Sequence, residues 1–412
     1  MSQTARRIAL FFFFTLSLAV LANVAQAQTP TDIYKFSGGA NGASPAAGVT
    51  FDRAGNLYGT TSADGVNFCG TVYRLRPSEN GWIYSSLFTF DEANGCTPES
   101  GVVFGPDGTL YGTTFGGGTG AEGTVYNLRP PATICRTGLC PWTETVLHNF
   151  TGIDGDGGNP ANGNLTFDST GNIYGTTSSG GEFDAGAVYK LTRNGDSWTE
   201  SVLHSFSDSN DGRYPEAGIT FDAAGNLYGT TPAGGTDDYG TVYELSPSGS
   251  GWVETILYSF TNGADGKTPA GGVAIDSNGN LFGTTAYGGA QNGGIGTAWE
   301  LTPAGGGQWT FTLLFQFTGR EDAEGSEATP TLDAAGNIYG TLLTGGDYGE
   351  VFALFPDGGG WRANFYPFNS SNGEQPVGGV TLDAAGNLYG TTVSGGNEDC
   401  DGGCGVVFEI TP

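Results

Sequence analysis

The sequence predicts an all-β fold, a seven-bladed β-propeller of four-stranded blades, closed by an N-terminal strand that completes the last blade. Three observations lead to this prediction. One segment recurs seven times at blade-sized intervals, and each copy contains strand-like runs of the kind that form a blade. The strand missing from the last copy is found at the other end of the chain.

The repeated segment is G-N-L-Y-G-T-T, which first occurs at residues 55–61. Its later copies, with small changes, begin at Gly108, Gly171, Gly225, Gly279, Gly336 and Gly386. Successive spacings are 53, 63, 54, 54, 57 and 50 residues, a period typical of propeller blades. The longest interval contains Cys135 and Cys140, in an insertion that a surface loop tolerates.

Each copy contains four short runs that are rich in β-branched and aromatic residues and are separated by Gly, Asn and Asp. In the fourth copy the expected strands are residues 218–222, 226–231, 240–245 and 252–260. The D-A-A-G-N joint between the first two runs predicts a tight hairpin whose Gly adopts a positive φ. We interpret the Gly that follows each repeated Tyr as clearance for a large side chain from the adjacent blade. Six Trp residues open the fourth run and are interpreted as structural: Trp82, Trp142, Trp198, Trp252, Trp309 and Trp361.

The two ends of the chain predict that the ring closes. The last copy begins at Gly379 and ends after its third strand, at residues 405–410. Its fourth strand is supplied by residues 32–36, D-I-Y-K-F, before the first complete copy. The numbers of strands match only in a closed ring, which leaves no open edge. An open solenoid would instead need a polar cap at each end.

The first 27 residues are expected to form a cleaved signal peptide, and residues 28–412 a single propeller domain. Arg6 and Arg7 precede an apolar run over residues 8–22, and Ala25-Gln26-Ala27 is a small-x-small cleavage pattern. This run is too short for a lasting membrane anchor. We therefore predict a soluble protein without a membrane span, exported to the periplasm, the cell surface or the extracellular space.

The chain is strongly acidic, with a formal net charge of −28 at pH 7. Such a surface repels phosphate backbones and anionic lipid, so neither nucleic acid nor a membrane is an expected partner, and the protein is expected to be a monomer. Six Cys in an exported chain predict disulfide bonds: Cys69, Cys96, Cys135, Cys140, Cys400 and Cys404. Metal binding by thiolates is the alternative, but no His lies near these residues.

Two sets of connections are expected to share one rim of the ring. They run from a fourth strand to the next blade and from a second to a third strand, and Cys69 and Cys96 would meet between them. The first set carries a repeated polar pair: Asn41-Gly42, Asn94-Gly95, Asp156-Gly157, Asp211-Gly212, Asp265-Gly266, Glu324-Gly325 and Asn372-Gly373.

Acidic residues in these connections make calcium the candidate ion, with Asp154, Asp156, Asp208, Asn210 and Asp211 as candidate ligands. No full calcium-loop pattern is present, and turn chemistry explains an Asp-Gly or Asn-Gly pair without any ion. Turn chemistry likewise explains the aspartates that recur at the opposite rim: Asp52, Asp168, Asp222, Asp276, Asp333 and Asp383.

The only two His, His148 and His204, occupy the same place in the fourth strand of two copies. Other copies have Thr89, Tyr258, Gln316 or Pro367 there, so we expect no metal or catalytic role for the two His. A Ser-His-Asp triad and a His-rich metal site are excluded on this reading. Residues that depart from the repeat are the candidates for a ligand site: Asp237, Asp238, Arg213, Tyr214, Arg320 and Glu321, with Lys267 and Asp347 beside them.

The pattern G-V-T-F-D-A-A-G-N-L-Y-G-T-T…G-T-V-Y-E-L resembles the GloVer tandem repeat of secreted bacterial proteins. That group is called choice-of-anchor because its members end in differing surface-attachment signals. The resemblance covers nearly all of residues 28–412 and implies export and surface display, with no activity or catalytic residues attached. The chain departs from it by showing no anchor signal. More distantly, G-V-A-I-D-S-N-G-N-L-F at residues 272–282 is similar to NHL-type propeller repeats, which supports the fold.

Strong repetition without a catalytic constellation favours a non-catalytic binding or surface-display module. Its expected ligand is a glycan or a protein, held by the loop-bearing rim. The alternative is a carbohydrate-active enzyme, a lyase or glycosidase, that uses rim carboxylates together with calcium. A passive matrix or envelope component is a third reading. Carboxylates that converge in one funnel pocket would favour the enzyme.

Overall fold

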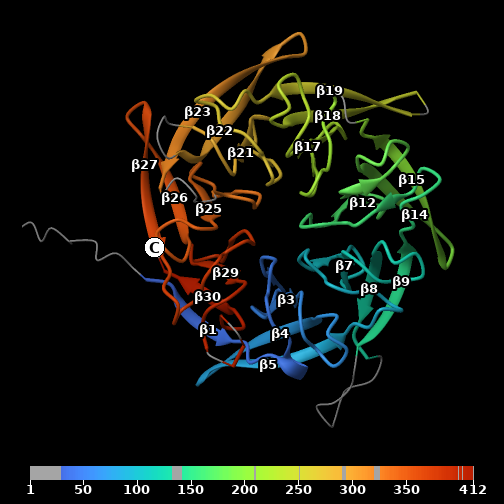
Figure 1. The fold of residues 1–412 in the computed structure, drawn as a ribbon, viewed down its shortest axis with the longest axis vertical. Helices are drawn as coiled ribbons and strands as arrows, with labels where there is room; N and C mark the ends of the chain where they lie inside the picture. Colours follow the sequence, from blue (N-terminus) through green and yellow to red (C-terminus); the bar gives the residue numbers. More distant parts are fainter. Residues whose placement is uncertain are drawn as a thin grey trace, which may run out of the picture.

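The predicted seven-bladed propeller is confirmed by the computed structural model of the protein, in which seven four-stranded antiparallel sheets surround a central opening (Figure 1). The structure describes residues 29–131, 142–207, 210–249, 251–289, 294–319, 325–397, 399–400 and 402–411. The predicted signal peptide, Cys135, Cys140, Asp208, Arg320, Glu321 and Glu324 lie outside these ranges. Among the described residues, no helix is long and apolar enough to cross a membrane.

The first four blades follow the chain in order, each from an inner to an outer strand. Blade 1 contains β2 (Thr50–Phe51), β3 (Leu57–Thr61), β4 (Thr71–Ser78) and β5 (Gly81–Thr89). Blade 2 contains β6 (Val103–Phe104), β7 (Leu110–Thr114), β8 (Thr124–Arg129) and β9 (Thr143–Asn149). Blade 3 contains β11 (Thr166–Phe167), β12 (Ile173–Thr177), β14 (Ala187–Asn194) and β15 (Ser197–Ser205). Blade 4 contains β16 (Thr220–Phe221), β17 (Leu227–Thr231), β18 (Thr241–Ser248) and β19 (Gly251–Ser259).

The remaining blades repeat this order until the ring closes. Blade 5 contains β20 (Ala274–Ile275), β21 (Leu281–Thr284), β22 (Gly294–Gly305) and β23 (Gln308–Thr318). Blade 6 contains β24 (Thr331–Leu332), β25 (Ile338–Leu342), β26 (Glu350–Asp357) and β27 (Gly360–Pro367). Blade 7 contains β28 (Thr381–Leu382), β29 (Leu388–Thr392), β30 (Val406–Ile410) and, from the other end of the chain, β1 (Thr31–Lys35). A short extra ladder joins β10 (Gly157–Gly158) to β13 (Ser179–Gly180), and one 3-10 turn, η1, spans Gly39–Asn41.

The N-terminal strand closes the ring as the strand count predicts. β1 pairs with β30 in antiparallel register, from Thr31 opposite Glu409 to Lys35 opposite Val406 (Figure 1). Near the axis, Thr391 Oγ1 donates to the carbonyl of Ala47 at 2.7 Å, so blade 7 is also bonded to blade 1. Equivalent threonines bond other neighbouring blades, such as Thr60 to Ser100 and Thr230 to Gly271. The junction between the two ends is therefore built like the others.

The hairpin that joins the first and second strands owes its shape to the repeated aspartate. In blade 4, Asp222 Oδ1 accepts hydrogen bonds from the backbone N–H groups of Ala224 and Asn226, both at 2.8 Å. Gly225 has a φ of 92°, as predicted from the D-A-A-G-N joint. The second carboxylate oxygen accepts a hydrogen bond from the Tyr228 hydroxyl at 3.3 Å, a bond that the sequence analysis did not foresee. Asp52, Asp168, Asp333 and Asp383 likewise bond both their turn and the repeated Tyr, whereas Asp276 bonds only its turn because Phe282 replaces the Tyr there.

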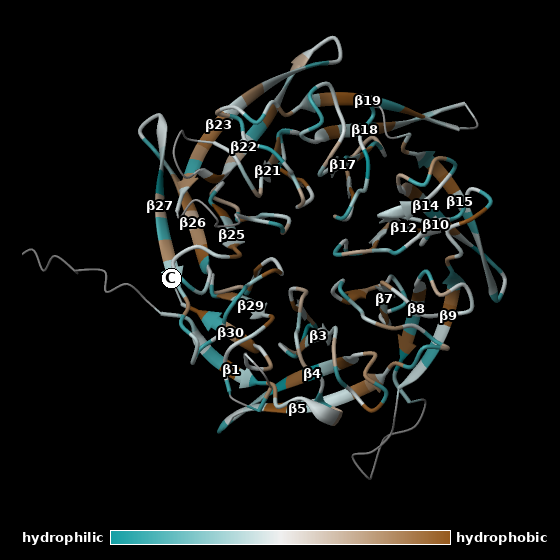
Figure 2. Cartoon of the chain, viewed as in Figure 1, coloured by the Kyte–Doolittle hydropathy of each residue, from teal (hydrophilic) through white to brown (hydrophobic). Residues whose placement is uncertain are grey.

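The hydrophobic core consists of layers between neighbouring blades, because both faces of a blade are covered. A buried Phe at the end of each outer strand packs on an aromatic ring from the third strand of the next blade. The ring centroids of Phe206 and Tyr243 lie 5.2 Å apart, and those of Phe36 and Tyr73 lie 5.1 Å apart across the closure. Similar pairs lie 4.8–5.8 Å apart at the other five interfaces. Hydrophobic stretches accordingly fall on strands such as β19, β22 and β26 (Figure 2).

The Gly after each repeated Tyr clears space for an aromatic ring, but the predicted source of that ring is wrong. Gly229 stands opposite Tyr243 in the pairing of β17 with β18, so the ring belongs to the same blade. A Cβ at Gly229 would overlap the Tyr243 hydroxyl, and Gly283 stands in the same relation to Trp299. The ring lies across its own sheet because the core layer on that side is already filled by the neighbouring Phe.

We expect Gly229→Ala to lower the free energy of unfolding by about 1–3 kcal/mol, because the added methyl forces Tyr243 out of its packed position. Urea denaturation measures this loss. Gly251→Ala is the matched control in the same blade, since its Cβ would meet no atom within 4 Å. Equal stability of the two variants would contradict the proposed role of the glycine.

Candidate functional site

The loop-bearing rim is formed as predicted by two sets of connections that contact each other. In blade 4, Arg213 and Ala233 form an antiparallel bridge between the loop from blade 3 and the loop from β17 to β18. The same bridge joins Ala43 to Ala63 and Lys267 to Tyr287. In blade 6 the predicted register of the repeated pair is wrong. In blade 5 the carbonyl of Thr268 accepts a hydrogen bond from the backbone N–H of Ala286. In blade 6 the carbonyl of Gly325 accepts the equivalent bond from Leu343. Gly325 therefore occupies the position of Thr268, two residues after the position of Gly266.

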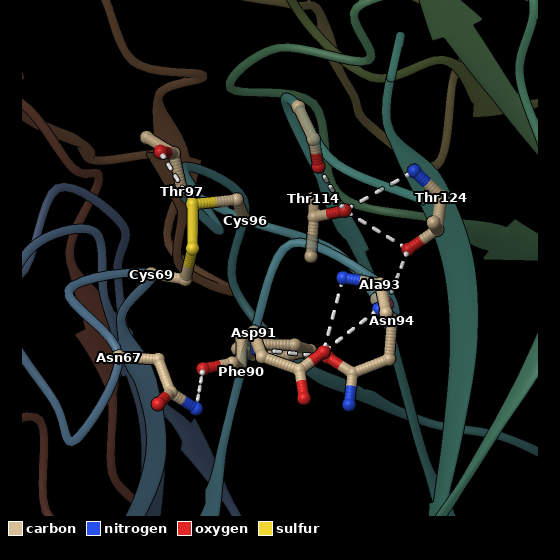
Figure 3. The surroundings of a disulfide bond; sticks show 11 residues. Asn67, Cys69, Phe90, Asp91, Ala93, Asn94, Cys96, Thr97, Thr114 and Thr124 are labelled. Atoms are coloured by element: carbon tan, nitrogen blue, oxygen red, sulfur yellow. Dashed lines mark hydrogen bonds between the residues drawn. A yellow bond between two sulfur atoms is a disulfide. The ribbon is translucent and has the colours of Figure 1, made fainter. Parts of the chain in front are cut away.

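The Cys69–Cys96 disulfide predicted on this rim is present and joins the β3–β4 connection to the loop that enters blade 2 (Figure 3). Beside it, Asn67 donates to the carbonyl of Phe90, and Thr114 and Thr124 share a hydrogen bond of 2.9 Å. Cys400 and Cys404 are also bonded to each other. Disulfides are typical of the oxidising extracellular space or periplasm, which is the setting that they indicate for this protein.

Three of the predicted ligand-site residues converge on the rim of blade 4. The Arg213 guanidinium lies 2.9 Å from the Asp238 carboxylate and 5.6 Å from the centre of the Tyr214 ring. Tyr214 has a φ of 59° and is 41% exposed, so this loop holds an aromatic ring out into solvent. Asp237 is exposed beside Asp238.

A second cation continues this surface onto blade 5. The Lys267 ammonium lies 5.8 Å from the centre of the Tyr239 ring and 6.0 Å from that of Tyr287. We call Arg213, Tyr214, Asp238, Tyr239 and Lys267 the blade-4 rim site. It combines exposed aromatic surface with both signs of charge, an arrangement suited to a ligand with apolar and polar faces.

Exposed apolar side chains gather on the same rim. Nine large hydrophobic residues of the described chain are exposed, and six of them lie in the rim connections: Val66, Phe68, Ile153, Phe183, Tyr214 and Tyr348. The other three, Ile83, Val253 and Phe365, lie on outer strands. They are distributed over blades 1, 3, 4 and 6, so the exposed apolar surface belongs to this rim as a whole and not to one blade.

The candidate calcium ligands are used largely by their own loops. Asp156 Oδ2 accepts from the backbone N–H and the hydroxyl of Thr151, both at 2.8 Å. Asp211 accepts from the backbone and hydroxyl of Ser207 at 3.1 and 2.9 Å. Asp154 is exposed and has a φ of 56°.

Three glutamates that were not predicted as site residues lie around the mouth of the axial channel. Glu99, Glu216 and Glu327 belong to blades 2, 4 and 6, and each lies three residues before the buried residue that opens the inner strand. The other blades have Ala46, Asn162, Ala270 and Val377 at this position. Burial raises the pKa of Glu99 above its ordinary value, and the charge of Glu216 raises it further. The effect of Glu216 on Glu99 indicates that these two side chains lie near each other at the mouth.

The channel itself has a volume of about 340 Å³ and is lined by the entry segments of five blades. Asn162 and Glu327 contribute polar side chains to its wall, which is otherwise formed mainly by Ala, Gly, Val and Thr. An acidic residue in every second copy was the available signal for this site. This pattern is hard to recognise in the sequence because each glutamate, considered alone, follows an ordinary turn.

Carboxylates also lie between the outer strands of neighbouring blades. Glu144, Glu200 and Glu254 occupy one position of β9, β15 and β19 and face the preceding blade. Burial raises the pKa of Glu144 to about 7, with a contribution from the Asp91 carboxylate, and it raises the pKa of Glu200 to about 7 and that of Glu254 to about 8. His148 and His204 lie in these layers, next to Asp156 and Asp211.

The chain matches a known repeat family over most of its length. Residues 19–143 and 133–306 match the model of the Gloeobacter/Verrucomicrobia repeat. The chain belongs to this family. The repeat segments within residues 19–306 are thus copies of the Gloeobacter/Verrucomicrobia repeat, and each supplies strands to the blades described above.

More distant comparisons add little. No curated protein matches this Gloeobacter/Verrucomicrobia repeat protein. A Thermus thermophilus protein described as an oxidoreductase (glucose dehydrogenase) is 15% identical, with a TM-score of 0.45 over 93% of this chain and 100% of that one. A Dyadobacter fermentans protein of unknown function is 12% identical, with a TM-score of 0.43 over 82% and 97%. Likeness at this level carries no inference about function.

We expect the buried carboxyl of Glu144 to make stability depend on pH. Its pKa is about 7 in the folded protein against 4.5 ordinarily, so the folded state binds the proton more tightly. The free energy of unfolding therefore falls as the pH rises from about 4.5 through 7. Glu144→Gln removes this loss, so its Tm relative to the unmodified protein should rise between pH 4.5 and pH 8.

Scanning calorimetry at the two pH values measures this difference. Glu79→Gln, at an exposed position of the β4–β5 hairpin, is the control and should show no such change. A Tm difference for Glu144→Gln that stays constant with pH would contradict the assignment.

Proposed function

We propose that this protein is an exported, non-catalytic binding module that holds a glycan on its loop-bearing rim. The observation that carries the proposal is the blade-4 rim site, where Tyr214 is held in solvent beside the Arg213–Asp238 ion pair. An exposed aromatic ring packs against the apolar C–H face of a sugar, while carboxylates and cationic groups bind its hydroxyls. Export agrees with the disulfides.

The bonds that order the rim loops support a binding role. Tyr214 lies on a loop fixed by backbone bonds on both sides, from Arg213 to Ala233 and from Tyr214 to Ala185. The Arg213–Asp238 ion pair further restricts the two connections relative to each other. A site on loops that are already ordered loses less conformational entropy when it binds.

A second candidate function has one specific observation in its favour. Glu99 and Glu216 approach each other at the channel mouth, and burial raises the pKa of both. A pair of carboxyls of which one stays protonated is the arrangement that glycosidases use. A carbohydrate-active enzyme is therefore the alternative to a binding module, with its reaction at the axis instead of at the blade-4 rim site.

We expect one class of glycan to raise the Tm of the mature protein in a thermal-unfolding screen, because a ligand that binds only the folded state stabilises it by mass action. Tyr214→Ala and Lys267→Ala should abolish the shift. Val253→Ala is the matched control, since Val253 is 52% exposed on β19 of the same blade but lies away from the rim. Each glycan is tested with calcium and with chelator, because we propose calcium as an accessory ion of the rim.

The outcomes separate the candidate functions. A shift that Tyr214→Ala leaves intact, or no shift with any glycan, would contradict the binding proposal. Release of reducing sugar that stops in Glu99→Gln or Glu216→Gln would show the enzyme instead. A shift that persists unchanged with chelator would remove calcium from the account.

A further inference from the structure

The side chains that face each other between the outer strands of neighbouring blades differ from one interface to the next. Where blade 7 meets blade 1, Tyr34 stacks on Tyr84 with ring centroids 4.7 Å apart. Where blade 4 meets blade 5, Tyr258 stacks on Phe311 at 4.3 Å. Within the described chain, the layer between blades 3 and 4 has no such ring pair, and His204 of β15 faces Glu254 of β19 instead. Polar groups thus replace aromatic packing at a half-buried position, where they need partners.

Three ligand atoms converge in this layer without bonding one another directly. His204 Nε2 lies 3.7 Å from Asp211 Oδ2 and 3.7 Å from Glu254 Oε1, and one atom from each residue lies within 4.8 Å of the others. Both distances are too long for a hydrogen bond. Among the described residues, His204 Nε2 and Glu254 Oε1 have no hydrogen-bond partner, although both atoms are shielded from solvent.

At the preceding interface the equivalent His and Asp bond each other directly, while Glu200 Oε1, the counterpart of Glu254 Oε1, likewise has no hydrogen-bond partner among the described residues. His148 and Asp156 are the counterparts of His204 and Asp211, and there the His148 Nε2 atom lies 3.2 Å from Asp156 Oδ1, within hydrogen-bond distance. The Asp156 carboxylate thereby closes onto the ring. Between blades 3 and 4 the corresponding atoms stand farther apart, which leaves a gap bounded by a ring nitrogen and two carboxylates.

This gap has the dimensions and the donor set of a metal site. A metal–nitrogen or metal–oxygen bond of about 2.0–2.2 Å places neighbouring ligand atoms roughly 3–4 Å apart. We propose that His204, Asp211 and Glu254 bind one divalent first-row transition ion, of which zinc is the probe, and that the ion joins blade 3 to blade 4. The imidazole nitrogen favours such an ion over calcium or magnesium, which prefer oxygen ligands.

The protonation states agree with this assignment. Burial lowers the pKa of His204, although the Asp211 carboxylate opposes the shift, so the imidazole is neutral at neutral pH and can offer a lone pair. Burial raises the pKa of Glu254 to about 8, with a further contribution from Asp211.

The proposed site lies beside a hollow that is open to solvent. His204 borders an open hollow of about 1130 Å³ between the loop into blade 3 and the β12–β14 connection. Asp154, Glu182 and Asp184 also line this hollow. Their charges raise the local concentration of cations at the entrance.

The test is titration of chelator-treated mature protein with zinc, followed by calorimetry, and with cobalt, followed by its visible absorption. We expect one ion per chain and a loss of affinity of more than about 100-fold in His204→Gln and in Glu254→Gln, above the loss typical for groups that only orient a ligand. Asp211→Asn is a third variant, and circular dichroism confirms that each one folds.

His148→Gln is the matched control, because it removes the equivalent residue of the preceding interface. It should leave zinc affinity and the cobalt spectrum unchanged. Failure of the unmodified protein to bind zinc, or equal loss in His148→Gln and His204→Gln, would overturn the proposal. Binding that survives in folded His204→Gln and Glu254→Gln would also overturn it, since the ion would then lie elsewhere.

Discussion

The packing of one buried Phe on an aromatic ring of the next blade holds the ring together. A single four-stranded sheet of this size cannot bury enough apolar surface to be stable alone. Phe206 on Tyr243 joins blade 3 to blade 4, and Phe36 on Tyr73 joins blade 7 to blade 1. A similar contact is present at every other interface. Stability therefore resides between blades, and each blade depends on both of its neighbours.

Because the blades are held together by these buried contacts, the residues at the rims can differ from one blade to the next. The Phe contact recurs at every interface, and an inner threonine donates to the next blade at five of them, whereas the residues in the outer part of each layer vary. Its residues range from the stacked pair Tyr34 and Tyr84 to the polar pair His204 and Glu254. The rim connections vary still more, since they lie outside the layers. The blade-4 rim site is accordingly a place where one copy departs from the repeat, whereas His204, Asp211 and Glu254 have counterparts at the preceding interface and differ from them in geometry.

Local features of the fold could be predicted from the sequence because they repeat. The strands of the fourth copy, the positive φ of Gly225 and the Cys69–Cys96 bond all follow from short-range patterns. The sequence could not predict which blade supplies the ring that lies opposite Gly229. A Gly is needed whether the ring comes from the next strand of the same blade or from a neighbouring blade. The register of Gly325 was misjudged because the loop into blade 6 has the same length as the loop into blade 5 but carries its Gly two positions later.

Sites that combine several blades were the least predictable. Arg213, Tyr214 and Asp238 were found because they lie in neighbouring loops of one blade. Glu99 and Glu216 are brought together only by the curvature of the ring, which no local pattern encodes. His204 was set aside as a structural residue, because its neighbour Glu254 comes from the next blade and neither one is unusual alone.

The most direct test of the account compares Phe36→Ala with Phe206→Ala by urea denaturation. Both side chains are fully buried, one at the junction of the chain ends and the other within the continuous chain. If all interfaces are equivalent, each substitution lowers the free energy of unfolding by about 3–5 kcal/mol in a single cooperative transition. A much smaller loss for Phe36→Ala than for Phe206→Ala would contradict closure of the ring by the N-terminal strand.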